Sequence, residues 1–289
     1  MSGPLLAIDG PFVLYRSFFA LPESITGVDD HPIGALLGAA NVILRIAADR
    51  SPRAIVVCFG AEAAKYRVEL YPGYHAERPP VPDALAWQFE QAPEMFAAFG
   101  WSSADAPELE ADDLLGSLAS TEVNGGGSTL ILTGDRDMYQ CARAGVSVLY
   151  LKMGSSGFEE VDPAEVRRRY GIPPELVPDF IALRGDPSDG LPGAKGIGAK
   201  TAADLLSRHG SLEAAIAAAD GERPRIAAAL RESADELRAF AVIATLQTLE
   251  VERPDDAPTD LAGGAAAARA LGMNKLAERL ERADTLAEL

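Results

Sequence analysis

The sequence predicts an α/β fold in which a mostly parallel central sheet is flanked by helices and followed by a helical domain. Short apolar, β-prone runs alternate with helical patterns in the first 150 residues, as in a doubly wound sheet. From about residue 162 onward the apolar patterns become helical. The chain has 289 residues, 48% of them hydrophobic, which is enough for both parts. We expect the α/β domain over residues 1–172 and the helical domain over 173–289.

Four apolar runs predict strands of a buried sheet, at residues 5–9, 54–59, 129–133 and 146–151. Helical spacing between these runs predicts helices at residues 33–49, 83–99 and 110–122. In the second part of the chain the same spacing predicts helices at residues 163–170, 175–183, 200–208, 211–219, 223–249 and 264–270.

Acidic residues stand at the ends of these predicted elements, where a fold can bring them together. Ligands of open α/β sheets bind at the carboxyl ends of the strands, where Asp9 and Asp135 are expected. Carboxylates gathered there repel one another and raise each other's pKa unless cations neutralise them, so an all-oxygen cluster predicts Mg²⁺ or Mn²⁺. Two such ions typically serve phosphodiester hydrolysis. The predicted metal ligands are Asp9, Glu110, Asp112, Asp113, Asp135, Asp137, Asp186 and Asp189.

Each acidic motif is weak evidence when it is taken alone. Glu110 and Asp113 stand three residues apart and share one helix face, whereas Asp112 is turned away from Glu110. Acids at a helix start also complement the helix dipole without any catalytic role. Asp135 and Asp137 follow a strand at spacing two, which can point both carboxylates the same way.

A glycine-rich stretch follows Asp186 and Asp189. Gly193, Gly196 and Gly198 predict a hairpin that leads into a helix, and backbone N–H groups can approach a phosphate there. The stretch is not a P-loop, because Ala199 interrupts the required motif. A simple turn between helices is the alternative.

Charge and composition limit the other possibilities. The net charge of −17, from 43 acidic against 26 basic residues, weighs against nucleic acid unless many acids bind metal and phosphates are held locally. No apolar run is long enough to span a membrane, and the N-terminus has no basic region. Cys58 and Cys141 are interpreted as buried thiols. We therefore expect a cytoplasmic protein that binds no membrane.

Four acidic motifs resemble, in order and spacing, those of the 5′ nuclease family. They are Asp9 after a strand, E-A-D-D, T-G-D-R-D-M-Y-Q and G-D-P-S-D-G-L-P-G-x-K-G-I-G-x-K-T-A. That family includes flap endonucleases and the 5′–3′ exonuclease domain of bacterial DNA polymerase I. The resemblance covers at least residues 5–215, and the chain ends at residue 289. It implies a stand-alone, monomeric 5′–3′ exonuclease or 5′-flap endonuclease. Such an enzyme hydrolyses DNA at flaps, nicks and 5′ ends in replication or repair, and leaves 5′-phosphates.

The resemblance also implies residue roles. One metal ion would lie among Asp9, Glu110 and Asp112, and the other five acids would lie around or behind a second. Residues 65–95 would form a helical arch over the active site, and a helix–three-turn–helix at residues 185–200 would grip duplex DNA and bind K⁺. The implied catalytic residues are Asp9, Lys65, Arg67 and Arg78. The implied DNA-binding residues are Tyr74, His75, Arg78, Gly193, Lys195, Gly196, Gly198, Lys200 and Thr201.

Two positions depart from the family pattern. Gly60 stands where relatives carry a metal-binding Asp, and His75 stands where they carry Lys. These departures leave open a nuclease-fold protein that binds branched DNA with weak or no catalysis, in which Gly60→Asp would raise activity. An RNA-cleaving nuclease also stays open, because recognition of the 2′-hydroxyl leaves no readable motif here.

Overall fold

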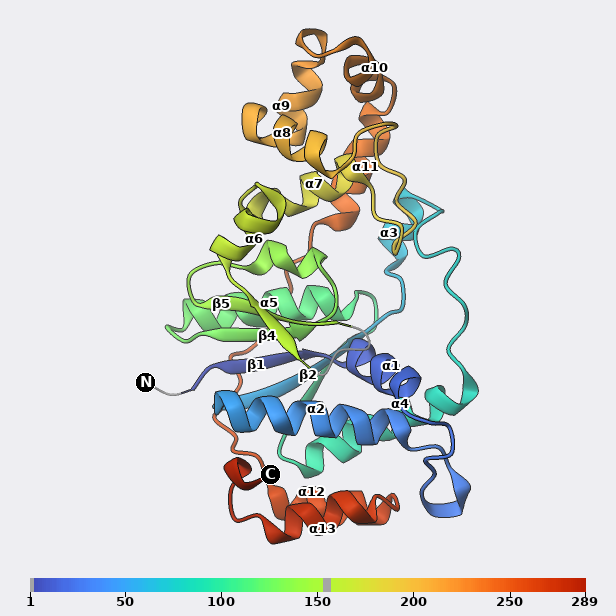
Figure 1. Cartoon of the computed structure of the whole chain (residues 1–289), viewed down its shortest axis with the longest axis vertical. Helices are drawn as coiled ribbons and strands as arrows, with labels where there is room; N and C mark the ends of the chain where they lie inside the picture. The colour runs from blue at the N-terminus through green and yellow to red at the C-terminus, as the bar shows by residue number, and fades with distance from the viewer. Residues whose placement is uncertain (1–2, 153–156) are drawn as a thin grey trace.

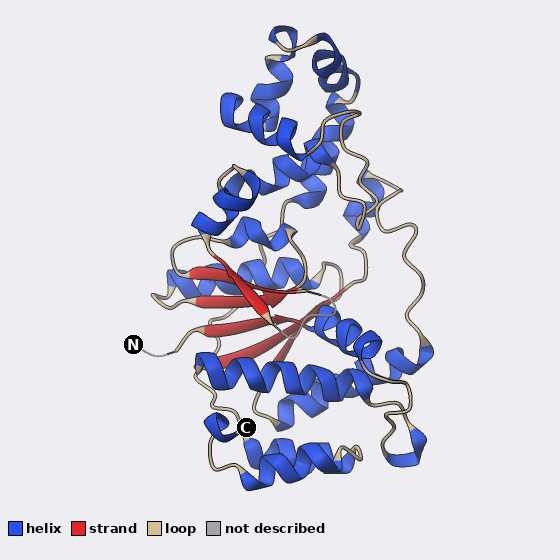
Figure 2. Ribbon diagram, viewed as in Figure 1, coloured by secondary structure: helices blue, strands red, loops and turns tan. Residues whose placement is uncertain are grey.

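A computed structural model describes residues 3–152 and 157–289; residues 1–2 and 153–156 of the expected α/β domain lie outside it. The described residues form a six-stranded sheet in the order β3-β2-β1-β4-β5-β6. The first five strands are parallel, and β6 is antiparallel to β5. Helices cover both faces of this sheet (Figures 1 and 2), which confirms the predicted α/β class. The strands are β1 (Leu5–Asp9), β2 (Ala54–Gly60), β3 (Ser102–Ala106), β4 (Thr129–Thr133), β5 (Val146–Leu151) and β6 (Phe158–Val161).

The four predicted strands are the four central ones, and the two that the sequence missed lie at the edges. β1 and β4 are fully buried, so their sequences read as continuous apolar runs. β3 has the sequence SSADA and is mostly exposed, and β6 has the sequence FEEV. An edge strand packs on one side only, and a search for apolar runs therefore overlooks it.

Four helices complete the α/β part. They are α1 (Gly10–Ala20), α2 (Gly34–Arg50), α4 (Asp83–Ala98) and α5 (Ala111–Asn124). The apolar faces of α1, α2 and α4 form one core on one side of the sheet, and α5 packs on the other side. The sequence analysis missed α1, which starts immediately after β1 with Pro11 in its first turn.

The helices of the second part stand above the sheet in Figure 1. They are α6 (Pro163–Tyr170), α7 (Val177–Arg184), α8 (Ala199–His209), α9 (Leu212–Ala217), α10 (Pro224–Glu232) and α11 (Ala234–Ala244). The predicted helix over 223–249 is in fact two helices that meet at Ser233, followed by non-helical chain from Thr245 onward.

The end of the chain differs from the expectation of one helical domain over 173–289. Helices α12 (Leu261–Ala270) and α13 (Asn274–Arg282) lie at the opposite end of the molecule from α8 and α10 (Figure 1). Their buried residues, among them Met273 and Leu276, join the core under α2 and α4. The connection is fixed by Trp101, whose Nε1 donates to Thr259 Oγ1 at 3.0 Å. An apolar helix face packs wherever its complement lies, and periodicity alone does not give that place.

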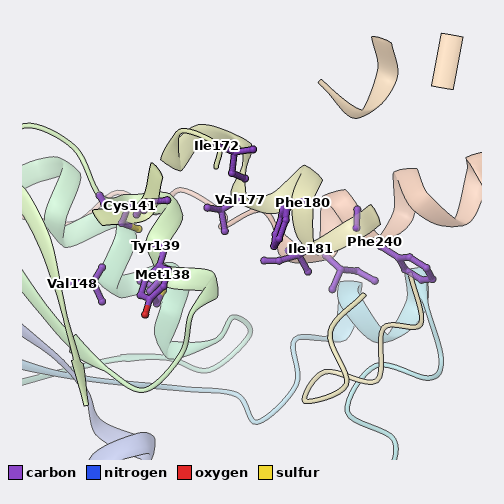
Figure 3. Close-up of a cluster of buried hydrophobic side chains, with 14 of the residues drawn as sticks. Met138, Tyr139, Cys141, Val148, Ile172, Val177, Phe180, Ile181 and Phe240 are labelled. Carbon is purple, nitrogen blue, oxygen red and sulfur yellow. The ribbon is translucent and has the colours of Figure 1, made fainter. Parts of the chain in front are cut away.

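One apolar core joins the sheet to the helices above it. It runs from the 3-10 helix η2 (Asp137–Cys141), through Met138 and Tyr139, to Phe180 on α7 and Phe240 on α11 (Figure 3). All four side chains are at most 1% exposed. The turn after α7 is thereby held in a fixed position relative to the ends of the strands.

The expected arch at 65–95 is a short helix followed by a proline-rich connection. α3 (Lys65–Leu70) precedes turns over residues 71–77, and non-helical chain then runs to α4. This connection forms the outer edge of the molecule in Figure 1, whereas α4 belongs to the core. Among the described residues, none of the helices has the length and apolar character needed to cross a membrane.

The chain that returns from α11 is held to the sheet domain by a buried ion pair. Glu122 on α5 is fully buried and accepts hydrogen bonds from Arg53 and Arg253. We expect Glu122→Ala to lower the free energy of unfolding by about 3–5 kcal/mol, because it removes the buried carboxylate of the pair and leaves the guanidinium of Arg53 with the exposed Asp256 as its ionic partner. Urea unfolding measures this change. The matched control is Asp220→Ala, in the exposed pair with Arg231. Equal effects of the two variants would contradict the role given to Glu122.

Candidate active site

A cavity of about 1110 Å³ opens at the carboxyl ends of β1, β2 and β4. Its lining joins the ends of these strands to the start of α5, the arch segment and the turn after α7. Seven of the eight predicted metal ligands line it, namely Asp9, Glu110, Asp112, Asp135, Asp137, Asp186 and Asp189. Carboxylates up to 180 positions apart in the sequence therefore share one space, as the sheet edge predicts.

Asp9 is held by two hydrogen bonds at the end of β1. Its Oδ1 accepts from the Phe12 N–H at 2.9 Å and so caps α1, and its Oδ2 accepts from Thr133 Oγ1 at 2.7 Å. Thr133 is the last residue of the neighbouring strand β4. The adjacent parallel strands thus fix the carboxylate against the cavity.

The loop after β4 presents the next two acids. Thr133 Oγ1 accepts from the Asp135 N–H at 3.0 Å, and Asp135 Oδ1 accepts from the Asp137 N–H at 2.8 Å. These local bonds fold the loop tightly at the spacing of two residues that the sequence shows. Both carboxylates consequently line the cavity.

The turn after α7 carries the last pair. Asp186 Oδ1 accepts from the Ser188 N–H at 2.9 Å, and its Oδ2 pairs with Arg184 at 2.8 Å. Asp189 Oδ1 contacts His75 Nε2 at 3.1 Å and Arg78 Nη2 at 3.4 Å. The proline and serine between the two acids form a tight turn, so both reach the cavity.

Asp113 does not have the position that we predicted. It is fully buried, outside the cavity lining, and its Oδ1 binds Arg67 Nη2 at 2.9 Å and the Gln247 N–H at 2.7 Å. Its Oδ2 accepts from the Glu110 N–H at 3.1 Å. Spacing of three along a helix indicated a shared face with Glu110, but the Asp113 side chain turns back to the helix start. Asp113 thus lies behind the cavity and holds Arg67 and the start of α5, and its role toward a metal ion stays a prediction.

Burial and mutual repulsion make the cavity carboxylates reluctant to ionise. Burial, followed by the charge of Asp189, raises the pKa of Asp135 to about 7. Burial and the neighbouring carboxylates also raise the pKa of Asp112 and Asp137 well above the usual value. The pKa of Asp9 is raised by burial against its own hydrogen bonds. A cation that entered the cavity would relieve the repulsion between these carboxylates.

The carboxylate oxygens of the cavity fit a hard divalent cation in chemistry, although they do not converge on one position. All are carboxylate oxygens, the ligands that Mg²⁺ and Mn²⁺ prefer. Within residues 3–152 and 157–289, no three acidic, histidine or cysteine side chains are grouped so as to hold one ion. Several of the acids are occupied instead by protein cations, as Asp186 is by Arg184 and Asp189 by Arg78.

The predicted catalytic cations have different surroundings. The Lys65 side chain is 88% exposed, pairs with Glu69 and lies outside the cavity lining. Arg67 lines the cavity but is buried in ion pairs, and Arg78 lines it beside Asp189. Sequence reasoning missed Arg136, which lines the cavity and lies over the Tyr150 ring at 5.6 Å. Its position in the sequence between Asp135 and Asp137 could have identified it as a cavity residue.

Aromatic and proline residues line the cavity together with the acids. Tyr15 lies near Phe89 in an edge contact with ring centroids 5.7 Å apart, and Phe19 is 65% exposed. The predicted contacts Tyr74 and His75 also line the cavity, and their rings stack with centroids 3.8 Å apart. Other apolar residues of the lining include Phe12, Pro79, Pro80, Val81 and Pro82. This wall suits the faces of unpaired bases.

The glycine hairpin lies apart from the cavity, at the start of α8. Gly193 and Gly196 have φ values of 65° and 81°, which only glycine adopts at low cost. Gly198 is exposed and begins α8, whose first turn contains no acidic residue. Lys195 and Lys200 are exposed, and Thr201 is partly exposed. Free N–H groups and cations here form a surface that suits phosphate.

Two family descriptions match consecutive parts of the chain. They are "5′-3′ exonuclease, N-terminal resolvase-like domain" over residues 4–171 and "5′-3′ exonuclease, C-terminal SAM fold" over residues 172–260. A "5′-3′ exonuclease" of Mycobacterium tuberculosis is 39% identical over 251 residues, which cover 80% of this chain and 78% of that relative. "DNA polymerase I, thermostable" of Thermus thermophilus is 35% identical over 290 residues, which cover 99% of this chain and 33% of that longer protein.

Solved structures share the fold at lower identity. The T5 D15 protein co-crystallised with metal ions has a TM-score of 0.66 and 17% identity over 98% of this chain and 99% of that one. The catalytic core of Rad2 in complex with DNA substrate has a TM-score of 0.64 and 14% identity over 96% of this chain and 93% of that one. Together with the family matches, which span residues 4–260, they lead to one conclusion: this chain belongs to the 5′–3′ exonuclease family.

Proposed function

We propose that this chain is a metal-dependent, structure-specific 5′ nuclease that hydrolyses DNA at 5′ flaps, nicks and 5′ ends and leaves 5′-phosphates. The observation that carries the proposal is the cavity at the sheet edge, where seven of the predicted acids, from four separate segments, meet under the arch segment. The relatives named 5′-3′ exonuclease and the Rad2 core solved with DNA substrate support the same activity.

We propose Mg²⁺ or Mn²⁺ as the cofactor, with two or more ions in the cavity. The residues that fit are the six cavity aspartates, Asp9, Asp112, Asp135, Asp137, Asp186 and Asp189. When bound, such ions neutralise these carboxylates and polarise the phosphodiester. The sheet edge fixes the acids in place, and Arg78 and Arg136 bring positive charge to the same cavity for the substrate phosphates.

The aromatic wall and the arch indicate how the strand would lie. A 5′ single strand that passes beside residues 71–82 would place its bases against Tyr15, Phe19 and Phe89, and its backbone toward the acids. Stacking tolerates any base, which suits an enzyme that recognises structure and not sequence. We favour DNA over RNA because of the relatives' names.

We propose that the hairpin at residues 185–200 binds the duplex backbone and holds K⁺. The exposed Gly198, which caps the start of α8, supports this role. The Arg225 guanidinium supports it too, because it lies directly against Gly196, where an added Cβ would be 2.8 Å from Nη2. Lysines and backbone N–H groups give affinity without sequence preference. We further propose a monomer that acts in the cytoplasm, where the free thiols Cys58 and Cys141 stay reduced.

The charge of Asp135 links activity to stability. We expect Asp135→Asn to lower Mg²⁺-dependent cleavage of a labelled 5′-flap duplex by about 10²-fold or more. Because the folded pKa, about 7, lies above the ordinary value of 3.8, ionisation opposes folding as pH rises through this range. Without metal at pH 8 the variant should therefore be more stable than wild type by at least about 1 kcal/mol. The gain should shrink at pH 5.

Calorimetry at both pH values, with and without Mg²⁺, measures this effect. Mg²⁺ should raise the melting temperature of wild type more than that of the variant. Full cleavage by Asp135→Asn, or a variant less stable than wild type at pH 8, would contradict the proposal.

The duplex-binding role of the hairpin has its own test. Lys200→Ala should weaken binding of a nicked duplex equally for all sequences, and should reduce the slope of log K against log salt by about 1. Fluorescence anisotropy at several salt concentrations gives this slope. Lys275→Ala changes an exposed lysine on α13, at the far end of the molecule, and should leave it unaltered.

The alternative of a DNA-binding protein with weak catalysis depends on Gly60. A Cβ there would lie 2.5 Å from Leu109 O and 2.7 Å from the Ala111 N, so the backbone of the α5 start already fills that space. We therefore expect Gly60→Asp to destabilise the protein by about 1–3 kcal/mol and to bring no gain in cleavage. Gly60→Ala should destabilise equally. Higher activity with an unchanged melting temperature in Gly60→Asp would favour the alternative.

A further inference from the structure

Glu110 is fully engaged by protein groups, although it lines the cavity. Its Oε1 accepts from the Ala64 N–H at 2.8 Å and pairs with Arg67 Nη1 at 2.9 Å. Tyr74 Oη donates to Oε2 at 2.9 Å. Burial and the adjacent Glu110 raise the pKa of Tyr74, so its phenol stays a proton donor. The Glu110 side chain is 11% exposed and has donors on both oxygens.

The cation that neutralises Glu110 is part of a larger buried junction. The Arg67 side chain is 3% exposed and binds Asp113 Oδ1 at 2.9 Å and the Ile243 carbonyl at 3.0 Å as well. It therefore joins α3 at the base of the arch to α5 and α11. If Glu110 turned to another cation, Arg67 would lose one of its two carboxylates inside the protein, which is unfavourable.

Next to Glu110, the backbone after β2 and the backbone before α5 lie close together. The Ala61 N–H donates to the Leu109 carbonyl at 2.8 Å, and the missing side chain of Gly60 allows this approach. The absence of an acid at position 60 and the engagement of Glu110 by Arg67 thus occur on the same side. The other acids that line the cavity are six aspartates and the exposed Glu62, which follows β2.

We propose that Glu110 anchors the base of the arch and is not a metal ligand in this chain, so that the cation site is formed by the cavity aspartates without it. Glu110 and Asp113 together hold Arg67, and Tyr74 and the Ala64 N–H complete the anchor. Glu110 is then a positioning residue for the arch. The inference rests on the proposed function for the presence of divalent cations in the cavity.

Titration calorimetry with Mn²⁺ alone compares two neighbouring positions on one helix. Asp112→Asn should weaken Mn²⁺ binding by at least about tenfold or remove one equivalent. Glu110→Gln should change Mn²⁺ affinity by less than about threefold. It removes one negative charge near the ions but, on this proposal, no ligand. It should however lower the melting temperature and speed hydrogen exchange over residues 64–75, because the bond to Arg67 is weakened.

A second measurement needs no variant. Hydrogen exchange of the wild-type Ala64 amide should be unchanged when Mn²⁺ is added to saturation, because Glu110 keeps this bond. Faster exchange of this amide with Mn²⁺ would show that Glu110 has moved to the metal, and would overturn the inference.

The outcomes separate the inference from the proposed function. If both variants lose the same Mn²⁺ equivalent, Glu110 is a ligand and the inference is wrong, while the proposed function stands. If Asp112→Asn binds Mn²⁺ as wild type does and both proteins fail to cleave a flap, the proposed function is wrong and the inference falls with it.

Discussion

Several carboxylates confined in one cavity are unfavourable unless each has a positive partner, and this constraint organises the molecule. Each acid meets it differently. Asp9 receives N–H and O–H donors from its own helix and from Thr133, and Asp186 receives Arg184. Asp112, Asp135 and Asp137 are left with a raised pKa, and a cation beside them would relieve their mutual repulsion. The folded protein therefore favours cation binding at these carboxylates, whereas the unfolded chain, in which they are far apart, does not.

The same constraint explains why the arch is tied to the rest of the protein. Its base supplies Arg67 to Glu110 and Asp113, and its turn supplies His75 and Arg78 to Asp189. Arch and cavity are thus coupled by charge and not by apolar packing alone. The position of this segment and the positions of the acids therefore cannot change independently.

The sequence predicted the central strands and the acids at their ends because both follow from local patterns. A buried parallel strand reads as an apolar run, and an acid after it lies at the sheet edge. What a side chain contacts was not predictable where the partner comes from a distant element: Asp113 binds Gln247, and Gly60 packs against the start of α5. Helix α13, with Leu276 and Leu280, likewise joins the core that contains α2, although its periodicity fits any apolar surface.

A net charge of −17 on a DNA-binding protein is explained by where the charges lie. Exposed charges more than about 8–10 Å apart are largely screened at physiological salt, so a distant acidic surface opposes binding only weakly. The groups near the phosphates decide the affinity, and on the proposed hairpin surface these would be Lys195, Lys200 and the N–H groups at the start of α8. The acids of the cavity count against DNA only until cations occupy them. Total charge is therefore a poor guide for this fold, because attraction and repulsion act at separate places on the same molecule.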